Sequence, residues 1–104
     1  IKDLGLFRTR LLALSPYQCY SYHKDPSQRV HIPLMTNDKC FMVVSNEVIW
    51  MPANGSSYLV DTTARHTALN GSDVRRLHIV GCTNEKTKDG ELWEERDHDI
   101  QINK

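Results

Sequence analysis

The chain has 104 residues, enough for one domain, residues 1–104, with a small hydrophobic core. Its 13 basic and 13 acidic side chains cancel, and no basic run exceeds the pair Arg75 and Arg76, which excludes the basic footprint of a nucleic-acid-binding protein. No apolar run approaches the roughly 18 residues of a spanning helix, and no leader peptide is evident. We therefore expect neither a nucleic acid nor a membrane as partner.

Three cysteines at wide spacing, Cys19, Cys40 and Cys82, form no C-x-x-C pair. This pattern indicates reduced thiols in a cytoplasmic protein rather than a disulfide framework. Buried structural cysteines are the expectation. The chain begins at isoleucine with residues that already read as strand, which indicates an upstream segment.

In chain order, short segments with period-two alternation are separated by turns rich in Gly, Pro, Asn and Asp. The predicted strands are 7–14, 18–24, 29–36, 40–45, 47–51, 57–62, 66–70 and 75–82. No segment has helical periodicity, so the sequence predicts an all-β antiparallel sandwich or barrel of jelly-roll type with its core in about 7–82. The polar tail 83–104 is expected to be loop with at most one edge segment or short helix.

The predicted strand 29–36 has two different faces. Val30, Ile32 and Leu34 share one face, and the other carries Arg29, His31, Pro33 and Met35. Such a polar face is unusual for a strand in a small core. It invites a search for a binding site nearby.

Upstream of this strand, His23 and Asp25 form an H-x-D motif. Residues two apart on an extended segment project to the same side, so both can bind one metal ion. His66, which follows the predicted strand 57–62, is the candidate third ligand because a rolled sheet can return it to the first pair. Two histidines and one carboxylate leave three positions open, as in non-haem Fe(II) oxygenases.

Arg76 lies ten residues beyond His66, on the next predicted strand. Its planar guanidinium suits the distal carboxylate of a keto-diacid co-substrate in bidentate fashion. Arg75 alternates to the opposite face.

Each residue also has a simpler interpretation. The H-x-D motif can be an exposed loop pair, His66 a capped histidine, Arg76 a surface arginine, and His31 and His78 satisfied half-buried histidines. Tyr20, Tyr22, Trp50 and Tyr58 are interpreted as core rather than pocket residues. Order and spacing together favour the metal and co-substrate site.

The segments HKDPSQRVHIPLMTN (23–37) and SYLVDTTARHTALNGSDVRRLHIVGC (57–82) resemble the aspartyl/asparaginyl β-hydroxylase family of Fe(II)- and 2-oxoglutarate-dependent dioxygenases. The resemblance runs from about Phe7 to Cys82 and includes bacterial relatives and free-proline hydroxylases. It implies a double-stranded β-helix, or cupin-like jelly roll. Relatives carry elements before Phe7 that complete the substrate pocket.

Residue by residue, the resemblance implies that His23, Asp25 and His66 bind the iron. Animal members have glycine at the position of Asp25, so the chain is closer to the bacterial and small-molecule branch. Asn70 matches an asparagine that frequently follows the distal histidine in the family, and the one role expected for it is to shape the turn.

The resemblance also implies that Arg29 and His31 reach the carboxylates of 2-oxoglutarate and that Arg76 clamps the far one. The implied reaction hydroxylates an aspartyl, asparaginyl or related amino-acid side chain and releases succinate and CO2. Peptidyl aspartate or asparagine, a free amino acid such as proline, and a lipid-attached acyl chain all stay open as substrates. So does the oligomeric state.

Two alternatives to this dioxygenase remain. One is a non-catalytic jelly-roll module that binds a metal or small anion. The other is an enzyme that uses zinc or another divalent ion at the same ligands. The position of Arg76 argues against both.

Overall fold

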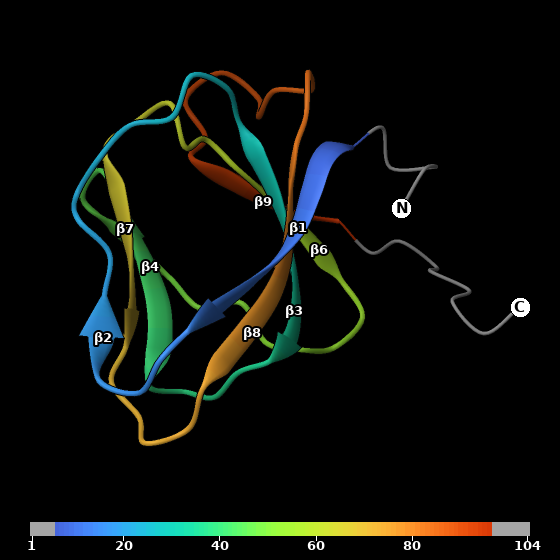
Figure 1. The fold of residues 1–104 in the computed structure, drawn as a ribbon. Helices are drawn as coiled ribbons and strands as arrows, with labels where there is room; N and C mark the ends of the chain where they lie inside the picture. Colours follow the sequence, from blue (N-terminus) through green and yellow to red (C-terminus); the bar gives the residue numbers. More distant parts are fainter. Residues whose placement is uncertain (1–5, 97–104) are drawn as a thin grey trace, which may run out of the picture.

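The regular structure of residues 6–96, the part of the chain that the computed structural model describes, consists of strands and contains no helix (Figure 1). The strands are β1 (Phe7–Leu14), β2 (Gln18–Cys19), β3 (Arg29–Met35), β4 (Cys40–Val44), β5 (Glu47–Ile49), β6 (Ser57–Val60), β7 (His66–Asn70), β8 (Arg76–Cys82) and β9 (Trp93–Arg96). Over this range, no helix long and apolar enough to cross a membrane is found.

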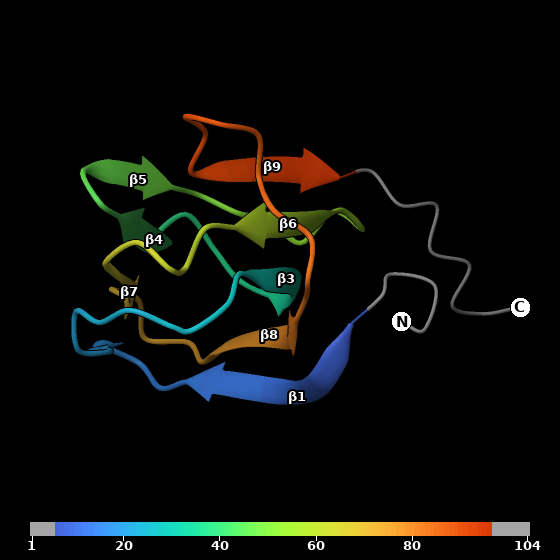
Figure 2. The ribbon, with the colours of Figure 1, turned by 90° about the horizontal axis from the view of Figure 1, so that it is seen from above.

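Two antiparallel sheets face each other, as the view in Figure 2 shows. One has the strand order β1-β8-β3-β6-β9 and the other the order β2-β7-β4-β5. The chain crosses repeatedly from sheet to sheet, because β3, β6 and β8 belong to the first and β4, β5 and β7 to the second. The prediction of an all-β antiparallel fold is therefore confirmed.

Most predicted strands are present with shorter ends, and the largest difference is in the predicted strand 18–24. Only β2 is paired there, and residues 20–28 run as irregular chain with a single bridge between His23 and His66. The predicted strand 57–62 stops at Val60, where the Thr62 amide turns back to the Val60 carbonyl. In both places, irregular backbone replaces strand next to the candidate ligands.

The main core lies between the sheets, and its buried members are Leu14, Met42, Val44, Ile49, Met51, Tyr58, Val60 and Ala68. A smaller cluster covers the outer face of the five-stranded sheet, with Val30, Ile32 and Leu59 at its centre. Period-two alternation along β3 therefore turns Arg29 and His31 toward the space between the sheets.

The alternation of β3 ends before the predicted strand does. Leu34 was expected to share the face of Val30 and Ile32, but it is 42% exposed. The pairing of β3 with β8 shifts register between Pro33 and Met35, and such an irregularity interrupts the alternation of faces.

Two further expectations concern the cysteines and the tail. Cys40 and Cys82 are buried, but Cys19 is exposed, because β2 is a two-residue edge strand.

In the tail, β9 pairs with β6 at the edge of the larger sheet, and Trp93 packs against the core between the sheets. The rest of the predicted tail, 97–104, lies outside the described residues.

Candidate metal centre and its cavity

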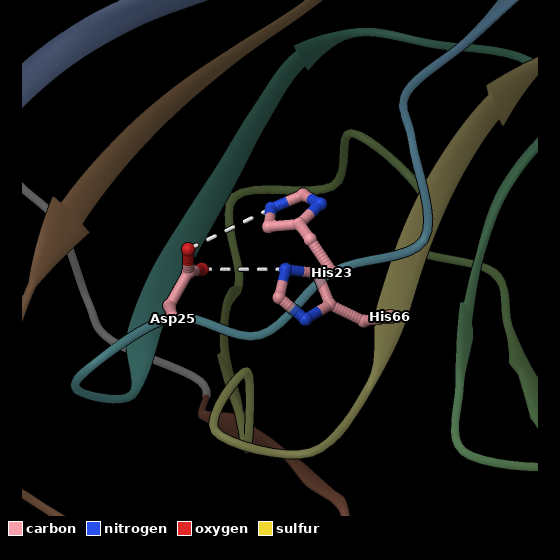
Figure 3. A group of neighbouring side chains, drawn as sticks. All are labelled: His23, Asp25 and His66. Atoms are coloured by element: carbon pink, nitrogen blue, oxygen red, sulfur yellow. Dashed lines mark ion pairs between the residues drawn. The ribbon is translucent and has the colours of Figure 1, made fainter.

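The side chains of His23, Asp25 and His66 point toward one another (Figure 3). Nε2 of His66 lies 3.2 Å from Oδ2 of Asp25, and Nε2 of His23 lies 3.6 Å from Oδ1 of the same carboxylate. One ligand atom from each residue falls within 4.8 Å of the others. In the described part of the chain, no other group of three His, Cys, Asp or Glu side chains comes together in this way.

Backbone hydrogen bonds hold these residues in place. The amides and carbonyls of His23 and His66 bond reciprocally at 3.0 and 2.9 Å, which ties the irregular segment before β3 to the start of β7. The amide of Asp25 donates to the carbonyl of Thr62 at 2.8 Å. The H-x-D spacing keeps His23 and Asp25 together in the sequence, and these backbone bonds bring the distant His66 to them.

Hydrogen bonds at Nδ1 determine the tautomers of His23 and His66. Nδ1 of His23 lies 2.7 Å from the carbonyl of Ser21, and Nδ1 of His66 lies 2.9 Å from the carbonyl of Ala64. A carbonyl oxygen only accepts hydrogen bonds, so Nδ1 carries the proton in each ring. In the neutral rings, each Nε2 then has a free lone pair beside Asp25, which is the state that binds a metal.

The three side chains border a cavity of about 220 Å³ between the sheets. His23 is the most exposed of them, and His66 is buried. The other residues that line the cavity come from both sheets and from the loops between them: Arg10, Leu12, Tyr20, Arg29, His31, Met42, Thr62, Ala68, Arg76 and Val80.

Arg76, at the start of β8, lines this cavity and is 1% exposed. Its Nε and Nη2 atoms are buried and have no hydrogen-bond partner among the described residues. Burial lowers the pKa of the guanidinium, since a charge in a dry site is costly. The neighbouring Arg75 is exposed, as alternation predicts. A buried cation with unused donors on a cavity wall suits an anionic ligand.

The start of β8 is positioned by Asn70, the last residue of β7. Its side-chain amide donates to the carbonyls of Leu14 and Val74, and its Oδ1 accepts from the amide of Ser72. Asn70 is 1% exposed. It therefore shapes the turn between β7 and β8, the role considered for it from the sequence.

Arg29 and His31 line the same cavity as Arg76. Nη1 of Arg29 donates to the carbonyl and hydroxyl of Ser27, and its Nη2 lies 3.9 Å from Oδ1 of Asp25. His31 is 5% exposed, and burial followed by the charge of Arg76 lowers its pKa to about 3. His31 is thus a neutral imidazole at neutral pH.

His78 departs from its expected character as a satisfied, half-buried histidine. It is 2% exposed, and its Nδ1 lies 3.1 Å from Nδ1 of His31. Its Nε2 is buried without a hydrogen-bond partner among the described residues. His78 is buried because its strand, β8, lies inside the sheet and pairs with β1 on one side and with β3 on the other.

The four aromatic residues interpreted as core divide into three groups. Tyr58 belongs to the core, as expected, whereas Tyr22 and Trp50 are 46% and 54% exposed. Tyr20 packs against the core and also lines the cavity. Nothing in the strand pattern distinguishes a core tyrosine from one at a cavity wall.

Arg10 is a cavity residue that the sequence analysis did not identify. With Arg8 and Arg29, it also borders an adjoining cavity of about 180 Å³. Arg8 has a positive φ of 51°, at the point where the pairing of β1 with β8 shifts register between Phe7 and Arg10. Alternation alone does not predict an irregularity of this kind, so it could not show which arginine lines the cavity.

Comparison with known protein families finds a match to this chain. The family model described as aspartyl/asparaginyl beta-hydroxylase matches residues 3–82. This range contains β1 to β8 and every cavity-lining residue named above. A search of the curated proteins found no match to the chain.

Proposed function

The chain belongs to the aspartyl/asparaginyl beta-hydroxylase family, and on that basis we propose that it is an Fe(II)- and 2-oxoglutarate-dependent dioxygenase. It hydroxylates an aspartyl, asparaginyl or related amino-acid side chain and releases succinate and CO2. The observation that carries the proposal is one cavity that joins a His-Asp-His cluster to a buried arginine whose Nε and Nη2 have no partner within residues 6–96.

The metal fits the donor set. His23 and His66 each offer an Nε2 lone pair, and Asp25 offers a carboxylate oxygen. Two imidazoles and one carboxylate are the ligands that non-haem Fe(II) oxygenases use, with other positions left for co-substrate and oxygen. His23, Asp25 and His66 would hold the ion.

The co-substrate fits the cationic wall. Arg76 is buried, and its Nε and Nη2 atoms have no partner in the described part of the chain; a dicarboxylate provides the anion that such a group requires. Arg29 and His31 line the same cavity and are available to the other end of the keto acid. When bound, Fe(II), oxygen and 2-oxoglutarate supply the oxidant.

The residues of the protein bind and orient the co-substrate. Neutral His31 adds no further charge to a wall that already carries Arg29 and Arg76, and it can donate one hydrogen bond to a carboxylate. Leu12, Met42 and Val80 give the cavity apolar walls that limit water around the reacting groups.

We also propose that the fold is a double-stranded β-helix. A chain that passes back and forth between two facing antiparallel sheets is typical of a double-stranded β-helix, or cupin-like jelly roll. In this arrangement, His66 at the start of β7, with His23 bridged to it, lies across the space between the sheets from β8.

An anaerobic titration tests the function. Addition of 2-oxoglutarate to the Fe(II)-loaded protein should produce a visible charge-transfer absorbance, and His66→Ala should abolish it. A silent spectrum together with tight zinc binding would overturn the proposal in favour of a metal-binding module. Mass spectrometry for the gain of one oxygen, on aspartyl or asparaginyl peptides and free amino acids, then identifies the substrate.

A further inference from the structure

His31 and His78 form a buried pair on neighbouring strands. In the pairing of β3 with β8, His31 lies opposite Val80 and Pro33 opposite His78, so the two imidazoles occupy diagonal positions on one face. Their Nδ1 atoms are 3.1 Å apart, and their rings meet edge to face at 83°. His31 lines the cavity, whereas His78 does not.

Both rings are neutral at neutral pH. Burial lowers the pKa of each, and the positive charge of Arg76 lowers it further. A hydrogen bond between two neutral Nδ1 atoms requires that one ring donates and the other accepts. Two arrangements satisfy this condition, and they leave opposite states at the two Nε2 atoms.

In the first arrangement, His31 donates. His78 then carries its proton on Nε2, which is buried and has no partner among the described residues. In the second arrangement, His78 donates from Nδ1, and its Nε2 is a bare lone pair. Orphaned buried N–H donors are rarer than undersatisfied acceptors, so the second arrangement is favoured.

The ligand side of the pair favours the same arrangement. If His78 donates, the proton of His31 is on Nε2, and His31 can donate to an anion in the cavity. If His31 donates, its Nε2 presents a lone pair to the same space, where it would repel a carboxylate. Arg29 and Arg76 make this wall attractive to anions, so a third donor complements it.

We propose that His78 donates its Nδ1–H to Nδ1 of His31 and thereby fixes His31 as an Nε2–H donor to the anionic co-substrate. His78 is a positioning residue that touches no ligand. It orients His31 as outer partners orient metal-binding histidines. The identity of the co-substrate rests on the proposed function, whereas the tautomer assignment does not.

Nuclear magnetic resonance tests the tautomers directly. In ¹⁵N-labelled full chain, two-bond ¹H–¹⁵N correlations should show His31 protonated at Nε2 and His78 at Nδ1. His31→Gln and His78→Asn assign the signals by deletion. The reverse pattern, or two rings that exchange tautomers, would overturn the proposal.

Ligand binding tests the consequence. His78→Asn retains an N–H donor close to the position of Nδ1, and His78→Leu removes it. With Mn(II) in place of iron, His78→Leu should bind 2-oxoglutarate about 10- to 100-fold more weakly, the range for lost outer partners, while His78→Asn should stay near the wild type. Affinity for Mn(II) alone should not change in either variant.

Equal 2-oxoglutarate affinities of the two variants would overturn the proposal. If His78→Leu does not fold, the tautomers of the wild type decide the question. If the wild type binds no 2-oxoglutarate, the proposed function fails, and the resonance spectrum still tests the His78–His31 bond.

Discussion

Oδ2 of Asp25 lies 3.2 Å from Nε2 of His66, although the two residues come from the irregular segment before β3 and from the start of β7. Reciprocal backbone bonds between His23 and His66 make this approach a property of the fold. The backbone therefore holds the cluster together, with Nε2 of both rings turned to the carboxylate.

Removal of one ligand should abolish the metal centre. His66→Ala takes away a nearly buried Nε2, so we expect Mn(II) affinity to fall by about 100-fold or more, beyond the loss typical of outer partners. Oxidation of 2-oxoglutarate should be lost with it. Lys24→Ala, an exposed change between His23 and Asp25, is the matched control. Normal turnover by His66→Ala would show that the site is elsewhere.

Arg76→Lys separates a keto-acid site from a metal-only site. Lysine keeps the charge but loses the planar fork, so 2-oxoglutarate binding should weaken by about 1.5–3 kcal/mol, the range for hydrogen bonds to charged groups. Calorimetric titration with Mn(II) measures the change. The exposed neighbour gives the control, Arg75→Lys, which should be nearly silent. Equal losses at both positions would remove the case for a carboxylate clamp.

Ligands should stabilise the fold. Mn(II) and 2-oxoglutarate bind a site that exists only in the folded chain, so at a hundredfold excess over the dissociation constant the free energy of unfolding should rise by about 2.7 kcal/mol. For a chain of this size, the melting temperature should increase on the order of 10 °C. Differential scanning calorimetry checks this, with His66→Ala as the unresponsive control. Identical melting curves with and without ligands would contradict a competent site.

Acid should destabilise the protein through its buried histidine pair. Burial lowers the pKa of His31 to about 3 and that of His78 in the same direction. Below pH 6.5, the unfolded chain binds protons on these rings and the folded chain does not. The free energy of unfolding should therefore fall as the pH decreases from 6.5 toward 3, by up to about 1.4 kcal/mol per pH unit and histidine.

Urea denaturation between pH 7 and pH 4 measures this slope. The double variant His31→Asn, His78→Asn lacks both titrating rings and should show a shallower dependence of stability on pH. A slope that does not change in the double variant would mean that other groups cause the acid sensitivity.

Asn70→Ala should test the turn that positions Arg76. The change leaves the buried carbonyl of Leu14 without its side-chain donor and deprives the Ser72 amide of its acceptor. Each loss costs about 1–3 kcal/mol, so we expect a total of about 2–6 kcal/mol in urea denaturation. Asn84→Ala, at an exposed position, should change stability by less than about 0.5 kcal/mol. A similar effect at both positions would argue against a special role of Asn70.

The sequence by itself determined what depends on local spacing. Period-two alternation gave the all-β class and the two faces at the start of β3, because side chains on a strand alternate whatever the strand pairs with. The same rule separated Arg76 from Arg75. The combination of H-x-D, a distant histidine and an arginine ten residues later indicates the family without the tertiary structure.

Only the tertiary structure decided what depends on register and irregular backbone. The contact of His31 with His78 follows from the pairing of β3 with β8, and neither strand encodes its partner's register. Cavity positions of Tyr20 and Arg10 likewise depend on irregular chain and a register shift, where alternation no longer applies. Local periodicity constrains the direction of a side chain, whereas its neighbours are set by long-range pairing.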